Sequence, residues 1–150
     1  MKTALAKCAP FKVRFTSESF GYFTHKKSST LWLKPLPVSE PTTAPTASEG
    51  AEGGKFIQPD TVHVPELINL QRTLEEAFPE CDELSKISKL GFQPHLSLGQ
   101  FATRDVEENA LRLQQGWQDE EMEVKEVYLI SRKDFNDPFH IRYTVRLGSA

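Results

Sequence analysis

The segment Gly91–Gln100 reads GFQPHLSLGQ and places a histidine two residues before a serine. Its alternating side chains predict a strand in which His95, Ser97 and Gly99 share one face. The apolar residues would then face the core on the other side: Phe92, Pro94, Leu96 and Leu98. Along such a strand His95 and Ser97 lie about 6–7 Å apart. An imidazole transfers protons near neutral pH, a hydroxyl donates to a phosphate oxygen, and a glycine leaves room for a ligand, so this face predicts a phosphate site. The plainer alternative is a strand histidine with an ordinary structural hydrogen bond.

Three further residues are candidates for contact with a substrate. Gln100 directly follows the motif and is a polar neighbour of the predicted site. Trp32 could stack on a base, although an aromatic residue in an alternating strand more often belongs to the core. Arg132 could meet a phosphate, or it could equally be a solvated charge. No Asp or His cluster has metal-ligand spacing, so neither a metal nor another cofactor is expected.

The other histidines do not repeat this pattern. His25 precedes two lysines in a predicted polar turn, and His63 precedes a Val-Pro pair at a helix entrance. His140 alternates onto the outer face of the last predicted strand. None of the three has a serine or threonine two positions later, so local structural roles are expected for them.

Hydrophobic periodicity predicts the elements that must position this segment. Residues 65–78 begin with proline and carry apolar residues three and four positions apart, which predicts a helix. A second helix is expected over 105–115, where Asp105 and Glu108 resemble a capping box. Strands are expected at Phe11–Phe15, Thr30–Leu33, 91–100, Glu123–Ser131 and Phe139–Leu147, the first two as an antiparallel pair. This order predicts the α+β class, with a mainly antiparallel sheet and helices on one side.

Length and composition indicate one folded domain over residues 1–150, because 38% of the 150 residues are apolar and 10% are aromatic. The stretch Val38–Gly54 is rich in Pro, Thr, Ser, Gly and Glu, which predicts a disordered insertion. The net charge of −3 argues against unspecific binding to nucleic-acid backbone as the main role, although a local basic cleft is compatible with it. No segment is apolar enough to span a bilayer, and Cys8 and Cys81 read as reduced thiols, so an intracellular, cytoplasmic protein is expected.

The pattern Gly-Phe-x-Pro-His-x-Ser-Leu-Gly resembles the second signature of the two-histidine (2H) phosphoesterase superfamily, which includes 2′–5′ RNA ligase-like and cyclic nucleotide phosphodiesterase proteins. Other segments are similar to that family in order and spacing: Pro10-Phe11, the aromatic turn at 20–23, Thr30–Pro35, the helix ending at Phe78-Pro79, Glu126–Arg132 and the strand from Phe139. The resemblance implies a bilobal fold in which two His-x-Thr/Ser motifs face each other across a cleft. It assigns His95 to acid–base chemistry and Ser97 to holding the phosphate, without a metal.

The first His-x-Thr motif of that family is expected before the Pro10-Phe11 strand, and the sequence has none there. The resemblance therefore implies an N-terminally truncated domain with an incomplete N-terminal lobe. Such a protein would act on, or only bind, cyclic phosphates of nucleotides or RNA ends, and it would be inactive if nothing replaces the first histidine. The alternatives are a non-catalytic nucleotide- or RNA-binding module and a partner-dependent protein that pairs through an open sheet edge, with a second copy or with another chain.

Overall fold

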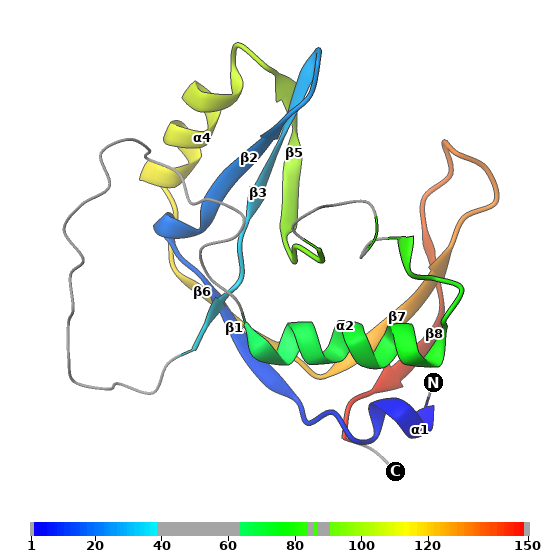
Figure 1. The fold of residues 1–150 in the computed structure, drawn as a ribbon. Helices are drawn as coiled ribbons and strands as arrows, with labels where there is room; N and C mark the ends of the chain where they lie inside the picture. Colours follow the sequence, from blue (N-terminus) through cyan, green and yellow to red (C-terminus); the bar gives the residue numbers. More distant parts are fainter. Residues whose placement is uncertain (1, 39–63, 84–85, 87–90, 149–150) are drawn as a thin grey trace, which may run out of the picture. The chain divides into compact units, whose positions relative to one another are not determined.

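The computed structural model describes residues 2–38, 64–83, 86 and 91–148. Its helices are α1 (Lys2–Leu5), α2 (Pro65–Ala77) and α4 (Val106–Gln115), with a short 3₁₀ helix at Ser17–Ser19. Its strands are β1 (Phe11–Phe15), β2 (Phe20–Thr24), β3 (Ser28–Leu33), β4 (Leu36–Pro37), β5 (Leu96–Ala102), β6 (Glu120–Val124), β7 (Glu126–Ser131) and β8 (His140–Arg146). The fold is α+β with antiparallel strand pairs, as predicted (Figure 1). The expected insertion, apart from Val38, and His63 lie outside the described residues.

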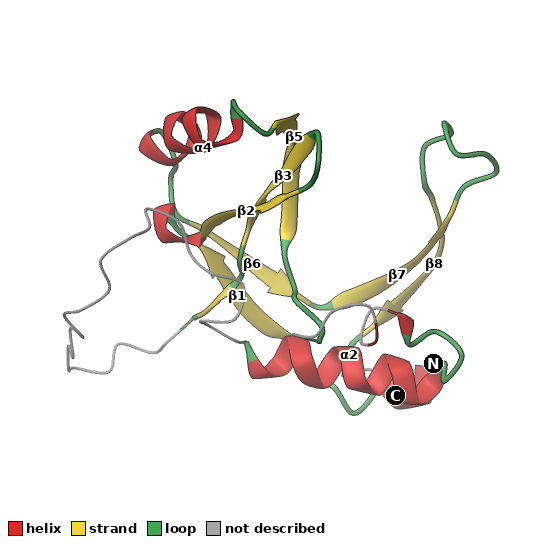
Figure 2. Cartoon of the chain, turned by 45° about the horizontal axis from the view of Figure 1, so that its top comes forward, coloured by secondary structure: helices red, strands yellow, loops and turns green. Residues whose placement is uncertain are grey.

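Segments far apart in the sequence build two compact units. The first comprises Met1–Phe11, Pro65–Phe92 and Glu123–Ala150, and the second comprises Lys12–Val64 and Gln93–Met122. The strands form a β4-β1-β6 sheet, a β2-β3-β5 sheet and a two-stranded β7-β8 ribbon (Figure 2). The predicted histidine–serine motif therefore belongs to the second unit, and the ribbon belongs to the first.

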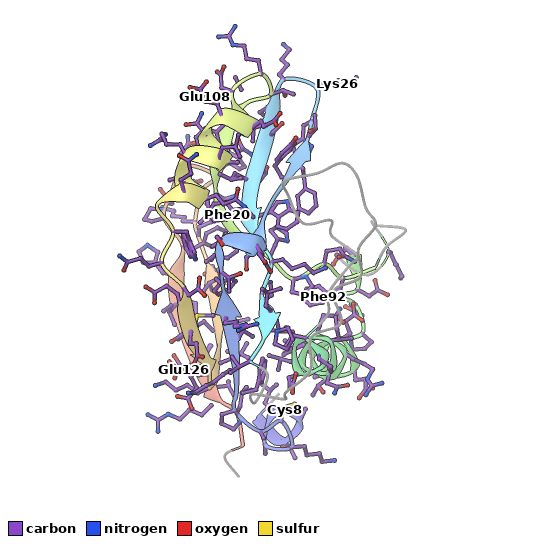
Figure 3. The ribbon with its side chains drawn as sticks, turned by 90° about the vertical axis from the view of Figure 1, so that its left-hand side faces the viewer. Cys8, Phe20, Lys26, Phe92, Glu108 and Glu126 are labelled. Carbon is purple, nitrogen blue, oxygen red and sulfur yellow. The ribbon has the colours of Figure 1, made fainter. Side chains whose placement is uncertain are left out.

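Helix α2 confirms the clearest prediction, because it spans residues 65–77 and begins at the expected proline. Its apolar stripe faces the core of the first unit, which consists of four buried residues: Leu5, Leu70, Val145 and Leu147. Further along the same stripe, Leu74 and Phe78 line a cavity of about 530 Å³ between α2 and β7. Phe92 lines this cavity as well and lies beside the helix (Figure 3).

The strands of the first half do not pair as predicted. β1 pairs with β4 and β6, whereas β3 pairs with β2 on one side and β5 on the other, so the expected pairing of 11–15 with 30–33 is wrong. Residues 20–23, expected as a turn, belong to a strand. A tight turn follows, in which the His25 backbone N–H donates to the Ser28 carbonyl at 2.8 Å. This hairpin gives β3 a partner that is nearer in sequence than β1.

The predicted strand Glu123–Ser131 is divided at Lys125 into β6 and β7, which belong to different sheets. The predicted closing strand is confirmed over His140–Arg146, but its burial is not uniform. Val145 is 4% exposed, whereas Tyr143 is 67% exposed, so the expected half-buried face exists only near the strand's end.

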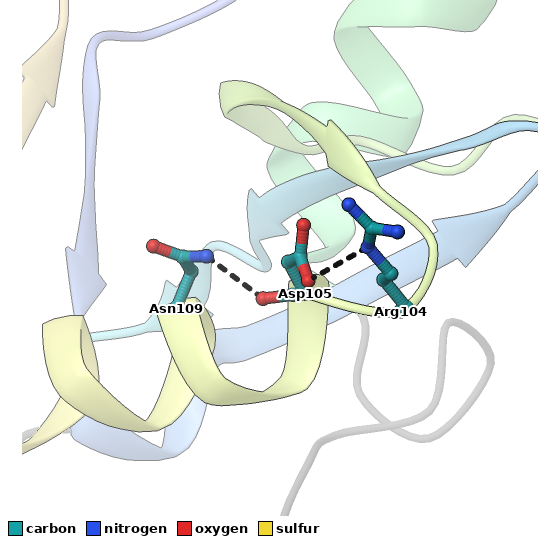
Figure 4. A network of polar contacts seen from close by, with 3 residues as sticks. All are labelled: Arg104, Asp105 and Asn109. Atoms are coloured by element: carbon teal, nitrogen blue, oxygen red, sulfur yellow. Dashed lines mark hydrogen bonds and ion pairs between the residues drawn. The ribbon is translucent and has the colours of Figure 1, made fainter.

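Helix α4 begins where predicted, but the expected capping box is absent. Asp105 has helical backbone angles and makes no capping hydrogen bond with its side chain, because a residue in that conformation does not aim its carboxylate at the first amides of the helix. Its carboxylate instead contacts Arg104 Nε at 3.3 Å (Figure 4). The Asn109 amide donates to the Asp105 carbonyl at 2.8 Å and supports this first turn.

Cys8 and Cys81 are free thiols, as expected. In the part of the chain that the structure describes, none of the helices has the length and apolar character that a membrane crossing requires.

Candidate functional site

The predicted motif lies at one edge of the β2-β3-β5 sheet. β5 begins at Leu96, so His95 immediately precedes the strand instead of lying within it. Ser97 is the cross-strand partner of Trp32 on β3, and Trp32 is in turn the partner of Gly21 on β2. One row of residues across the three strands therefore ends at Ser97, and His95 flanks that row.

Helix α4 contacts all three strands and covers one face of this sheet (Figure 1). On that face the Phe20 ring meets the Trp117 ring edge-on, with centroids 5.4 Å apart. Leu31 and Leu33 are fully buried there. Since side chains alternate along a strand, Trp32 points to the opposite face, where the motif lies.

On that opposite face, the rings of Phe23 and Trp32 pack against the His95 imidazole. These two rings are called the aromatic bed. The Phe23 and His95 centroids are 5.3 Å apart with their planes at 84°, and the Trp32 and His95 centroids are 6.3 Å apart. Phe23 and Trp32 pack on each other at 5.0 Å. Gly21 makes this arrangement possible, because a Cβ there would lie 2.2 Å from Trp32 Cη2. The bed restricts the imidazole from one side.

A hydrogen bond determines which nitrogen of His95 is reactive. Nδ1 lies 2.8 Å from the carbonyl oxygen of Gln93. A carbonyl only accepts, so Nδ1 carries the proton and donates it. In the neutral ring Nε2 then holds the lone pair and can take a proton, and in the charged ring Nε2–H can give one. The exposed His95 side chain is therefore set up for one proton transfer.

Ser97 offers a hydroxyl next to this imidazole. Its side chain is exposed, and its hydroxyl has no hydrogen-bond partner among the residues that the structure describes. The neighbouring Leu96 was expected in the core but is 47% exposed, because α4 covers the sheet only in part and β5 is an edge strand.

A β-bulge in β5 changes the predicted distribution of side chains. Gly99 lies opposite Leu31, whereas Ser97 lies opposite the next residue of β3, so Leu98 is an extra residue. The prediction that Gly99 shares a face with Ser97 is therefore wrong, as is the prediction that Leu98 is in the core, since it is 36% exposed. The bulge instead brings Gln100 onto the face of Ser97, because the alternation is shifted by one residue.

The remaining candidates fall in different places. Trp32 is 1% exposed, so its stacking on a base stays a prediction that this burial disfavours. Arg132 lies in the first unit, just after β7. His25 lies at the other end of β5, where the Thr103 hydroxyl donates to the His25 carbonyl at 3.3 Å. This end of the strand is about 20 Å along the sheet from the His95–Ser97 motif. His140 is exposed on β8 of the first unit.

Sequence reasoning missed three parts of this site. Phe23 and Gly21 were assigned to a turn, although the alternation of residues 20–23 is also compatible with a strand. The Gln93 carbonyl left no signal at all, because a backbone acceptor is independent of residue type.

Comparison with known proteins gives one positive result. The family model described as the 2′-5′ RNA ligase superfamily matches residues 1–135. Neither the search of curated proteins nor the search of solved structures gives a significant match.

Proposed function

Because the chain belongs to the 2′-5′ RNA ligase superfamily, we propose that His95 and Ser97 bind the cyclic or terminal phosphate of a nucleotide or RNA end. One observation carries the proposal: the exposed His95 imidazole is held through Nδ1 by the Gln93 carbonyl at 2.8 Å, which leaves Nε2 for a ligand. The Ser97 hydroxyl is the neighbouring donor to a phosphate oxygen. Gln100 is proposed as a further polar contact on the same face.

The proposed chemistry is hydrolysis of a 2′,3′-cyclic phosphodiester. The oxygen of a water molecule forms a bond to phosphorus, and the bond from phosphorus to one ribose oxygen breaks. A base takes a proton from the water, and an acid gives a proton to the leaving ribose oxygen. His95 Nε2 performs one of these transfers, while Ser97 Oγ–H donates to a non-bridging oxygen.

A second candidate function is recognition of the phosphate without turnover. The position of His25 favours it, because this other described histidine of the second unit lies at the far end of the sheet and does not form a pair with His95. Losing one member of an acid–base pair lowers the rate by about 10²–10⁴-fold. Binding would then persist with little or no hydrolysis.

The test measures hydrolysis and binding of 2′,3′-cyclic nucleotides by the wild type and by His95→Ala and Ser97→Ala. His25→Ala is the matched control, since it removes an exposed imidazole from the same unit. Because hydrogen bonds to a charged group contribute about 1.5–3 kcal/mol, each site variant should bind about 10–100-fold more weakly. Turnover that disappears with His95 supports an enzyme, and binding without turnover supports the second candidate. Equal binding by wild type and both site variants refutes the proposed site.

A further inference from the structure

The hairpin of β7 and β8, residues 126–146, carries most of the large apolar side chains that are exposed in the described chain. Eleven large apolar side chains are exposed among the described residues. Seven of them lie on this hairpin: Tyr128, Leu129, Ile130, Phe135, Phe139, Ile141 and Tyr143. Phe135 is 81% exposed at the loop, which projects beyond the ends of the two strands (Figures 1 and 2). A concentration of apolar surface on one element indicates an interaction site.

Among the described residues, the hairpin packs on the core of the first unit at the end that carries Val127 and Val145. It is a two-stranded sheet, and isolated two-stranded sheets are marginally stable in water. Val145 anchors one end in the core of the first unit, but Ile141 and Tyr143 are more than half exposed. A partner that covers the loop end would remove this surface from water.

The side chain of Arg132 holds two aromatic rings at the loop. Its guanidinium carbon lies 4.5 Å from the centroid of Phe135 and 4.7 Å from that of Phe139. Its Nη1 also donates to the Phe135 carbonyl. Both rings are thus fixed by cation–π contact on one side and remain more than half exposed. Fixed aromatic rings with open faces are the platforms on which the bases of single-stranded nucleic acids stack.

Residues 126–146 carry four Arg or Lys and three Asp or Glu, a small excess of positive charge in a chain whose net charge is −3. β8 contains Arg142, Arg146 and His140 and no acidic residue. The Arg142 Nε donates to Ser131 Oγ at 2.8 Å, which holds its guanidinium at the surface of the hairpin. Lys133 is exposed next to Arg132. Such cations are the usual partners of phosphate groups.

The Asp137 carboxylate has a local structural role in the loop, whereas Asp134 takes part through its backbone alone. The Asp137 carboxylate accepts the backbone N–H of Asp134 at 3.1 Å, and the Asp137 N–H donates to the Asp134 carbonyl at 3.1 Å. These two bonds close the loop that presents Phe135. The carboxylate of Asp137 is therefore occupied within the loop.

We propose that this hairpin binds single-stranded RNA, with bases stacked on Phe135, Phe139 and Tyr143 and phosphates bound by Lys133 and Arg142. The choice of RNA rests on the proposed function, which concerns RNA ends. The proposal requires no particular placement of the two units, because every residue named belongs to the first. It adds recognition of single-stranded RNA by the first unit to the phosphate binding proposed for the second unit.

Two other occupants fit the hairpin less well. A second copy that paired with β8 across a twofold axis would bring together two strands that each carry two arginines and no acidic residue. The register of the hairpin also shifts at Arg142, and a bulge of this kind disfavours edge pairing. A membrane surface is disfavoured because the loop tip, Lys133–Asp137, carries a single apolar side chain, Phe135, whereas membrane-binding segments bury several apolar residues at the headgroup level.

The experiment measures fluorescence anisotropy of a labelled oligouridylate that ends in a 3′-hydroxyl, so that no terminal phosphate engages His95. The full chain is compared with the double variant Phe135→Leu/Phe139→Leu, which keeps apolar bulk but removes both rings. Phe78→Leu is the matched control, because Phe78 is an exposed phenylalanine outside the hairpin. Since each stacked base contributes substantially to affinity, the double variant should bind about tenfold more weakly or worse, while the control binds like the wild type.

The charged contacts are tested through the salt dependence of the same binding. Lys133→Gln should reduce the magnitude of the slope of log affinity against log salt by about 0.7, the value for one phosphate contact of a single strand, whereas Lys27→Gln, at the exposed β2-β3 turn, should not. Arg132→Lys keeps the charge but loses the planar contact, so it should weaken binding nearly as much as the double variant does.

The phosphate site at His95 and the RNA-binding hairpin can be refuted independently of each other. His95→Ala should leave the affinity for this oligonucleotide unchanged, and the hairpin variants should leave binding of a 2′,3′-cyclic mononucleotide unchanged. The hairpin proposal is overturned if the double variant binds the oligonucleotide as tightly as the wild type. It is equally overturned if the wild type binds only anionic vesicles, or if the wild type forms dimers that the double variant does not form and neither binds RNA.

Discussion

Replacing Gly21 by alanine tests whether the aromatic bed supports the motif. The added Cβ would lie 2.2 Å from Cη2, 2.5 Å from Cζ2 and 2.6 Å from Cζ3 of Trp32. Ordinary carbon contacts are about 3.5–4.0 Å, so the indole would have to move by roughly 1 Å or more. It cannot do so freely, because it is 1% exposed and packs on Phe23 and His95.

The magnitude follows from overpacking. Inserting a methyl group into a packed site costs about 1–3 kcal/mol, and alanine regains about 0.5–1 kcal/mol relative to glycine in a strand. With all three ring atoms too close, we expect a net loss of about 2 kcal/mol, which lowers the melting temperature by about 4–8 °C in a chain of this size. The displaced Trp32 should also shift His95 and weaken binding of a cyclic nucleotide.

The measurement is urea unfolding and differential scanning calorimetry of Gly21→Ala beside Gly99→Ala. Gly99 lies in the same sheet, but a Cβ there would be 3.6 Å from the nearest atom of Phe101, which is ordinary contact. Gly99→Ala should therefore leave the free energy of unfolding unchanged or raise it by up to about 1 kcal/mol, the gain of alanine over glycine in a strand. Equal stability of the two variants would refute the reasoning about Trp32.

Two smaller predictions concern hydrogen bonds elsewhere. Ser19 is fully buried, and its hydroxyl accepts the Thr16 backbone N–H at 2.9 Å, so Ser19→Ala should lower the free energy of unfolding by about 1–3 kcal/mol by leaving that donor unsatisfied. Ser17→Ala, at an exposed neighbouring position, is the control in the same denaturation assay, and comparable losses in both would contradict the assignment. The hydrogen bond from Tyr128 to the Glu126 carboxylate raises the pKa of the Tyr128 phenol. Its contribution to stability is therefore present below the unfolded value of about 10 and is lost as the pH rises through the higher folded value. Glu126→Gln should lower the pKa of Tyr128 in an NMR titration of its ring, and an unchanged pKa would show that the bond is not formed.

The features readable from the sequence are those whose physical cause is local. Helix α2 was predicted nearly to the residue, since a proline start and an apolar stripe at helical spacing act within one segment. The same holds for the motif, in which a histidine and a serine two positions apart must lie close together in any extended chain. The composition likewise indicated a folded domain, and the order of the predicted elements indicated the α+β class.

Tertiary structure decided which strands meet and which face each side chain takes. The partners Trp32 and Ser97 are distant in sequence, and the bulge at Leu98 exists only because β3 and β5 pair in this register. That shift moves Gly99 away from the motif and brings Gln100 to it, which no alternation within β5 could indicate. The aromatic bed has the same origin, because Phe23 and Trp32 reach His95 from two other strands. A sequence determines the chemistry of a segment, but the pairing of strands joins residues whose separation along the chain leaves no local pattern.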